Sequence, residues 1–167
     1  MSTRELPDAE ALVAELTRHM RPAVSANTAL VGIRTGGAWI AERLHRDLRI
    51  AVPLGTLDVS FYRDDYERRG LHGNVKPSEI PFEVEGRDII LVDDVLNTGR
   101  TIRAAMNELF DYGRPASIRL AALVDRGGRE LPIAAQFLGA TVETAPGEGI
   151  ELLRNDEGRF SLRLYRD

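Results

Sequence analysis

The segment from Ile89 to Thr101, IILVDDVLNTGRT, constrains the fold of this chain more than any other segment. Its four leading apolar residues predict a strand that is buried on both faces, as in a parallel sheet. Asp93 and Asp94 follow at the carboxyl end of that strand. A small polar turn, residues 97–101, then leads into a helix, whose first free N–H groups favour an anion. The segment therefore predicts one site that holds a sugar diol beside a phosphate.

The carboxylate pair has an alternative interpretation, in which one group caps a helix or turn and the other is solvated. The position of the pair after a buried strand argues against this alternative, because burying a carboxylate costs free energy unless the group is hydrogen-bonded or ion-paired. Two carboxylates can accept hydrogen bonds from neighbouring ribose hydroxyls, and Asp93 can help to orient Mg²⁺, a cation that prefers oxygen ligands. No set of protein ligands for a metal is firm. For the turn, the alternative is ordinary N-capping by Thr98. Together the two halves favour an enzyme that acts on a phosphorylated sugar.

Composition sets the broad class. The chain has 167 residues, 43% of them apolar and 29% charged, which suits one soluble domain spanning residues 1–167. Its net charge of −4 favours neither nucleic acid nor an anionic membrane. The absence of cysteine excludes disulfides and thiolate metal sites. No apolar run is long enough to span a bilayer, and the N-terminus lacks the apolar core of a signal peptide, so we expect a cytoplasmic protein.

Strands and helices are predicted to alternate along the chain. Helices are expected at residues 8–21, after residue 37 and after residue 101, the last with a buried stripe of Ile102, Ala105, Met106, Leu109 and Phe110. Strands are expected at residues 29–33, 54–62, 79–84, 89–92 and 118–124, and a hairpin at 150–153 and 160–164. This order predicts an α/β fold with a mainly parallel sheet. A long polar loop, residues 63–78, is expected to be functional or mobile.

Three loops should meet at one edge of this sheet, because ligands of parallel α/β sheets bind beyond the carboxyl ends of the strands. They are residues 34–37, 93–101 and 125–132. The long loop 63–78 is placed to cover them. The sequence thus predicts a site built from segments that are far apart along the chain.

The motif IILVDDVLNTGRT resembles the 5-phosphoribosyl-1-pyrophosphate (PRPP) signature of the type I phosphoribosyltransferases. Further segments resemble one family within them, the bifunctional pyrimidine operon regulators and uracil phosphoribosyltransferases (PyrR). These segments are VGIRTGG, GTLDVSFYRDDY, VKPSEIP and GRPASIRLAALVDRGGRELPI. The resemblance covers nearly the whole chain, about residues 8–165. It implies the type I phosphoribosyltransferase fold with a flexible hood loop, and conversion of uracil and PRPP to UMP and pyrophosphate.

The resemblance also implies roles for individual residues. Asp93 and Asp94 would bind the ribose hydroxyls, within a PRPP-binding run whose other members are Val95, Leu96, Asn97, Thr98, Gly99, Arg100 and Thr101. The pyrophosphate would meet Arg34, Thr35, Gly36, Gly37, Arg63 and Asp64, with Arg63 acting when the hood closes. The base would be recognised by Val124, Asp125 and Arg126. Mg²⁺ is expected to enter with PRPP.

Each of these assignments has a structural alternative. Residues 34–37 also suit a simple strand-to-helix turn, and Arg63 a solvated hairpin tip. Asp125 and Arg126 also suit a local ion pair.

Three positions depart from the family pattern. Asn97 stands where members carry Tyr, Gly36 where they carry Arg, and Gly128 where they carry His. The glycine at position 36 removes a cation from the pyrophosphate loop, for which Arg34 or Arg63 is expected to compensate. The glycine at position 128 removes a polar group near the base and near the surface that family regulators use for RNA.

Two rival functions stay open. One is an RNA-binding attenuator with weak catalysis, which would bind pyr operon leader RNA in response to UMP or UTP. Arg18, His19, Arg21 and Arg34 are candidate contacts for RNA, although scattered arginines on solvated faces are the favoured explanation. The other is a phosphoribosyltransferase for a purine base. The resemblance further implies a homodimer or a higher homo-oligomer, and no membrane partner.

Overall fold

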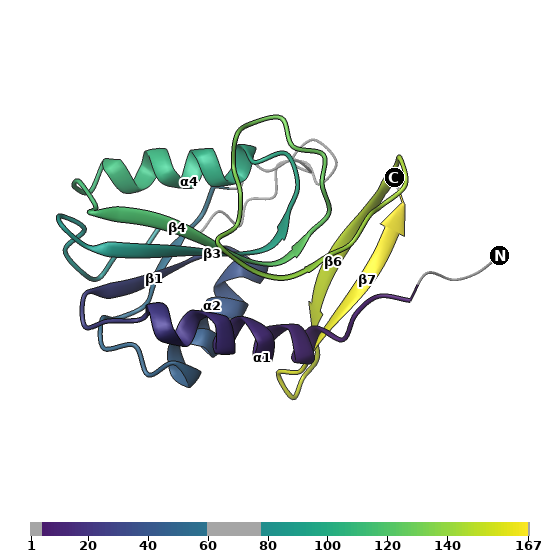
Figure 1. Cartoon of the computed structure of the whole chain (residues 1–167), viewed down its shortest axis with the longest axis horizontal. Helices are drawn as coiled ribbons and strands as arrows, with labels where there is room; N and C mark the ends of the chain where they lie inside the picture. The colour runs from purple at the N-terminus through teal and green to yellow at the C-terminus, as the bar shows by residue number, and fades with distance from the viewer. Residues whose placement is uncertain (1–4, 60–77, 167) are drawn as a thin grey trace.

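A parallel sheet of five strands organises the structure, a computed structural model that describes residues 5–59 and 78–166 (Figure 1). Its spatial order is β2-β1-β3-β4-β5, and each neighbouring pair is parallel. The strands are β1 (Thr28–Ile33), β2 (Gly55–Leu57), β3 (Asp88–Leu96), β4 (Ser117–Asp125) and β5 (Phe137–Thr141). The predicted α/β fold with a parallel sheet is confirmed.

Helices cover both faces of the sheet. The apolar side chains of each helix pack against apolar side chains of the central strands. On one face lie α1 (Ala9–Met20), the short 3₁₀ helix η1 (Arg21–Ala23) and α2 (Gly36–Asp47). On the other face lies α4 (Arg100–Phe110), as Figure 1 shows. Asp8 caps α1, its carboxylate accepting from the N–H of Glu10. Among the described helices, none has the length and apolarity that crossing a bilayer requires.

The strand β3 runs further than predicted and carries the two key carboxylates within it. The prediction ended the strand at Val92, whereas β3 continues to Leu96. The reason is that β4 stays paired with it as far as Leu96 and Asp125. Its pairing with β1 on the other side stops at Val92. Asp93 and Asp94 therefore lie where one edge of β3 has lost its neighbour.

Beyond the end of β1, the start of α2 lies beside the last residues of β3. The helices that follow β1 and β3 lie on opposite faces of the sheet, so the chain opens a crevice between these two strand ends. Ligands of open α/β sheets bind at such a point.

Other predicted elements need correction. The strand predicted at 54–62 is only β2, and its expected residues 60–62 lie outside the described part. The strand predicted at 79–84 is reduced to a single bridge between Thr56 and Glu79. Phe110 was expected in the buried stripe of α4 but is 55% exposed, because it belongs to the last turn of the helix, beyond the edge of the core. The strand β5 was not predicted at all.

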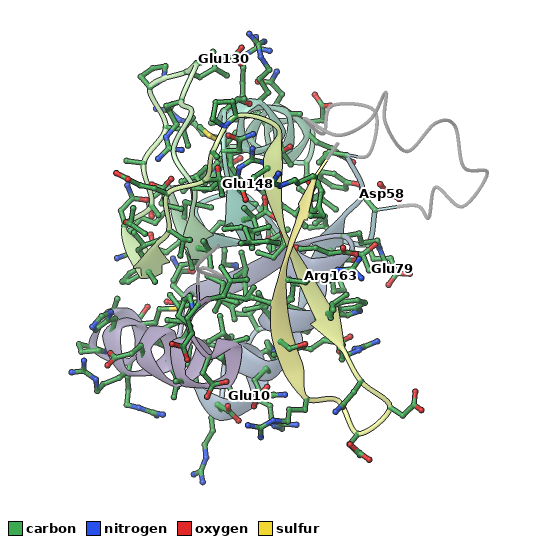
Figure 2. The ribbon with its side chains drawn as sticks, turned by 90° about the vertical axis from the view of Figure 1, so that its right-hand side faces the viewer. Glu10, Asp58, Glu79, Glu130, Glu148 and Arg163 are labelled. Carbon is green, nitrogen blue, oxygen red and sulfur yellow. The ribbon has the colours of Figure 1, made fainter. Side chains whose placement is uncertain are left out.

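The predicted C-terminal hairpin is confirmed and is anchored to the helices. Strands β6 (Glu148–Arg154) and β7 (Phe160–Arg166) pair in antiparallel fashion. Glu10 in α1 accepts from Arg43 in α2 at 2.8 Å and from the N–H of Phe160 at 2.8 Å. The guanidinium of Arg43 also lies 4.6 Å from the ring centroid of Phe160. Figure 2 shows the hairpin crossing this end of the molecule, with Glu10 near its turn and Glu148 near its other end.

Candidate active site

A pocket of about 250 Å³ lies at the carboxyl ends of β1 and β3, beneath the hairpin. It joins four segments of the chain: the start of α2, residues 93–101, the loop after β4, and the hairpin. Its lining residues are Thr35, Gly36, Trp39, Asp93, Asp94, Val95, Asn97, Thr101, Arg126, Ile150, Glu151, Leu152 and Tyr165. The three loops that the sequence predicted to meet at this edge therefore do so.

The carboxylates of Asp93 and Asp94 are held by the backbone that follows them. Asp93 is 5% exposed, and its Oδ1 accepts from the N–H of Asp94 at 2.9 Å. Asp94 Oδ1 accepts from the N–H of Val95 at 2.8 Å. These bonds fix the orientation of each side chain. An ionised carboxylate has about four lone-pair sites, so a group of this kind can accept several hydrogen bonds at once.

The start of α2 is packed directly onto the carboxylates. A Cβ at Gly37 would lie 3.0 Å from the Cα of Asp93, and one at Gly36 would collide with the side chain of Asp94. Thr35 and Gly36 line the pocket, whereas Arg34 reaches sideways and donates to Thr56 Oγ1 at 3.1 Å. The turn thus connects β1 to α2 and also forms a wall of the pocket.

The turn before α4 presents part of the predicted phosphate cradle. Gly99 is the N-cap residue and has a φ of 95°, a conformation that glycine adopts without strain. Thr98 Oγ1 accepts from the N–H of Arg100 at 3.1 Å, so the predicted capping by Thr98 occurs one residue away from the cap position. Asn97 and Thr101 line the pocket. Val95 also lines it, whereas Leu96 is buried in the core.

The side chain of Arg100 does not join this cradle. Its guanidinium pairs with Glu130 at 2.9 Å, and the two side chains are 57% and 52% exposed. Only the backbone of this residue faces the start of the helix. In this arrangement the guanidinium of Arg100 is held by Glu130 and its N–H by Thr98, so the phosphate contact of Arg100 stays a prediction.

The loop after β4 contributes one residue to the pocket, Arg126. Its Nη2 donates to the carbonyl of Glu148 at 2.9 Å, which links the loop to the hairpin. The alternative of an ion pair between Asp125 and Arg126 is wrong, because Asp125 pairs with Arg129 at 2.5 Å. The side chain of Val124 is fully buried between the strands, so only its backbone can serve recognition.

Sequence reasoning missed several lining residues. Trp39 lies on α2, and the guanidinium of Arg154 lies 4.4 Å from its ring centroid. The hairpin supplies Ile150, Glu151, Leu152 and Tyr165. Trp39 had a detectable signal, since it is the single tryptophan and stands next to a predicted ligand-binding turn. The hairpin residues had none, because no local pattern shows that a C-terminal hairpin folds back over the sheet.

Arg63 and Asp64, predicted to bind pyrophosphate, lie outside the described residues, as does almost all of the hood loop 63–78. Their assignments stay predictions.

The donor set suits a metal that arrives with its substrate. The pocket offers oxygen donors from Asp93 and Asp94, which are the kind that Mg²⁺ prefers. Within residues 5–59 and 78–166 there is no group of three or more His, Asp or Glu side chains that would hold a metal alone. Mg²⁺ commonly binds proteins through one or two carboxylates and keeps substrate or water oxygens as its other ligands.

Comparison with known families is consistent with this geometry. The model of the phosphoribosyl transferase domain family matches residues 2–146. A curated relative from Pseudomonas syringae pv. syringae (strain B728a), named "Bifunctional protein PyrR", is 51% identical over 151 residues, covering 88% of this chain and 89% of its own. A relative of the same name from Nitrosococcus oceani is 56% identical over 137 residues, covering 81% and 77%.

Solved structures share the fold at low identity. A hypoxanthine-guanine phosphoribosyltransferase from Bacillus anthracis matches with a TM-score of 0.68 and 21% identity, over 90% of this chain and 88% of that chain. The enzyme of the same class from Leishmania tarentolae, in complex with GMP, matches with a TM-score of 0.65 and 19% identity, over 90% and 85%. These structures establish the type I phosphoribosyltransferase fold, but they do not identify the base that this chain uses.

Proposed function

Because this chain belongs to the phosphoribosyltransferase family, and within it to the bifunctional PyrR proteins, we propose that it transfers the 5-phosphoribosyl group of PRPP to uracil. The products are UMP and pyrophosphate. One observation carries the proposal: the carboxylates of Asp93 and Asp94 and the start of α4 open onto the same pocket. A sugar diol and a 5′-phosphate belong to one molecule, so one pocket must serve both.

The sugar phosphate is held by β3 and by the turn that follows it. The remaining acceptor sites of Asp93 and Asp94 take the ribose hydroxyls. The N–H groups at the start of α4, with the hydroxyls of Thr98 and Thr101, take the phosphate, because a helix N-terminus favours negative charge. Leu96 and Gly99 serve this part only through the backbone.

The reaction is a displacement at C1′. The N1 atom of uracil forms a bond with C1′ while the bond from C1′ to the pyrophosphate oxygen breaks with its electron pair, and N1 loses its proton. The positive charge that develops on the ribose ring lies close to the carboxylates of Asp93 and Asp94, which stabilise it. The protein supplies mainly orientation and charge, two effects that account for large rate enhancements.

The leaving group would occupy the side of the pocket near α2. Thr35, Gly36 and Gly37 present backbone there, and Arg34, Arg63 and Asp64 are proposed to complete the pyrophosphate site. Asp93 and Asp94 are the residues that would hold Mg²⁺ together with the substrate. When bound, Mg²⁺ would neutralise charge on the departing pyrophosphate.

The base is proposed to lie against the loop after β4. Val124, Asp125 and Arg126 are proposed to recognise the edge of the pyrimidine, and of the three Arg126 lines the pocket. Activity with uracil and none with hypoxanthine or guanine is the expected result.

The first test is a base panel. Purified protein is incubated with PRPP, Mg²⁺ and uracil, hypoxanthine, guanine or orotate, and nucleotide formation is followed. UMP alone is expected. The variant with Asp93→Asn and Asp94→Asn should form none, whereas Asp111→Asn, at an exposed helix end, should keep wild-type activity. Undiminished UMP formation by the double variant would refute the site assignment, and a different nucleotide would refute the choice of base.

A second function is proposed on a separate observation, a cluster of cations on the surface away from the pocket. Arg21, Arg46 and Arg49 line one depression where α1 and α2 end, together with Asp47, which pairs with Arg46. Arg18 lies one turn back on α1, where it pairs with Glu15. Such a surface suits the phosphates of pyr operon leader RNA, with UMP or UTP as the signal. Salt-sensitive binding that weakens in Arg46→Gln and Arg49→Gln would support it, and no binding at low salt would exclude it.

The remaining assignments follow from family membership. We propose a homodimer or a higher homo-oligomer, which light scattering would test, and a cytoplasmic location, which suits the substrates.

A further inference from the structure

Three consecutive carbonyl groups at the end of β3 are each bonded to the loop after β4. The carbonyl of Leu96 accepts from the N–H of Arg126 at 3.0 Å. The carbonyl of Thr98 accepts from the N–H groups of Glu130 and Leu131 at 2.9 and 3.2 Å. Between them, the carbonyl of Asn97 accepts from Nη1 of Arg129 at 2.5 Å. The side chain of Arg129 therefore supplies the middle bond of the three, and backbone N–H groups supply the other two.

Arg129 makes a second bond that fixes the loop itself. Its Nη2 donates to Asp125 Oδ2 at 2.5 Å, while Asp125 Oδ1 accepts from the N–H of Gly127 at 2.9 Å. The side chains of Arg129 and Asp125 are 26% and 17% exposed. A charge-assisted hydrogen bond of this kind is stronger than one between neutral groups, and its partial burial shields it from solvent.

Arg129 thus joins two walls of the pocket without lining it. Asn97 lines the wall that precedes α4, where the 5′-phosphate is proposed to bind. The loop fixed by Asp125 carries Arg126, which lines the wall proposed to recognise the base. The guanidinium of Arg129 bridges these two segments at the level of Asn97, with one nitrogen bonded to each.

We propose that Arg129 is a positioning residue for the transfer reaction, and this inference rests on the proposed function. It fixes the distance between the turn at residues 97–101 and the loop at residues 125–128. The bond between N1 and C1′ can form only when the base and the ribose meet at that spacing. A shift of about 1 Å between reacting groups costs about 10²-fold in rate.

The test separates positioning from simple stability. In Arg129→Gln, kcat for UMP formation should fall about 10²-fold. The Kd for Mg²⁺ and PRPP, followed by the emission of Trp39, should stay near the wild-type value, because β3 and α4 still present the ribose and phosphate contacts. Arg129→Lys should give an intermediate kcat, since an ammonium group cannot reproduce the planar fork.

The matched control is Arg87→Gln. Arg87 also donates to a backbone carbonyl, that of Glu83 at 3.1 Å, but this contact is exposed and Arg87 does not line the pocket. Its kcat should equal that of the wild type. If Arg129→Gln proves too unstable to assay, Arg129→Lys keeps the charge and decides the question alone.

The outcomes are distinguishable. An active wild type with full kcat in the Arg129→Lys or Arg129→Gln variant would overturn this inference and leave the proposed function intact. A lowered melting temperature with unchanged kcat would assign Arg129 a purely structural role and also overturn it. A wild type that forms no UMP would overturn both proposals.

Discussion

Gly36, in the first turn of α2, lies directly against the carboxylate of Asp94 near the end of β3. A Cβ at position 36 would collide with Asp94 Oδ2 and lie 2.8 Å from its Cγ. The neighbouring Gly37 is similarly close to the backbone of Asp93. The two glycines therefore allow the start of a helix to approach the paired carboxylates, and the missing side chain at position 36 has a structural reason.

This contact predicts that any side chain at position 36 displaces Asp94. Gly36→Ala should lower kcat/KM about tenfold or more, as expected from misplacement of a substrate-binding group. Its melting temperature should fall, because the displaced Asp94 loses its hydrogen bond from the N–H of Val95. Gly36→Arg restores the residue type that the family pattern has here, and it should not raise activity. Steady-state kinetics and thermal unfolding check both variants, and a Gly36→Arg variant faster than the wild type would contradict the prediction.

A second prediction concerns the pair formed by Asn97 and Gly128. A Cβ at Gly128, which has a φ of 80°, would lie 2.7 Å from Asn97 Oδ1. Gly127 has a φ of 76° and nothing within 4 Å of the same position, which makes it a matched control. Gly127→Ala should cost about 1 kcal/mol of unfolding free energy from backbone strain alone. Gly128→Ala should cost more and should also lower activity, because it pushes on Asn97 in the pocket wall. Equal losses of unfolding free energy and equal activity in the two variants would show that Asn97 moves aside without cost.

A third prediction concerns pH and the anchor of the hairpin. Burial alone would raise the pKa of Glu10, but hydrogen bonds from Arg43 and from the N–H of Phe160 outweigh it and hold this pKa below the ordinary 4.5. Because the folded pKa is the lower one, the stabilisation is complete above pH 4.5 and is lost as the pH falls through the folded pKa. Glu10→Gln should therefore cost about 1 kcal/mol at pH 7 and clearly less at about pH 3.

Urea unfolding at the two pH values measures this difference. Glu15→Gln is the control, since the pKa of Glu15 is also lowered, mainly by its hydrogen bond from Arg18, but the pair lies on the surface. This control should unfold like the wild type at both pH values. A cost for Glu10→Gln that does not depend on pH would mean that its charge is irrelevant to the anchor.

A fourth prediction uses Trp39 as a reporter. It is the only tryptophan, it lines the pocket, and Arg154 from the hairpin lies 4.4 Å from its ring centroid. Binding of UMP, or of PRPP with Mg²⁺, should change its emission, whereas free ribose should not. Arg154→Gln should shift the emission of the unliganded protein and cost about 0.5–1 kcal/mol, the usual value for a cation–π contact at an exposed site. Trp39 emission that is unchanged by UMP and by PRPP with Mg²⁺ would argue against binding in this pocket.

The sequence by itself determined the α/β class and the central motif, because these depend on local patterns. A continuous apolar run predicts a buried strand, and Asp93 and Asp94 follow it in the chain whatever the rest of the protein does. The glycine and hydroxyl residues of the turn at 97–101 predict a helix start in the same way. The convergence of three loops also followed, since parallel strands end at the same edge of a sheet.

The tertiary structure alone decided how that motif is enclosed. The extension of β3 to Leu96 depends on pairing with β4, and the partner of Asp125 proved to be Arg129 rather than its neighbour in sequence. The hairpin covers the pocket through Glu10 and Arg43, two residues more than a hundred positions away from it. Such contacts leave no periodic pattern in the sequence, because their energy comes from groups that only the folded chain brings together.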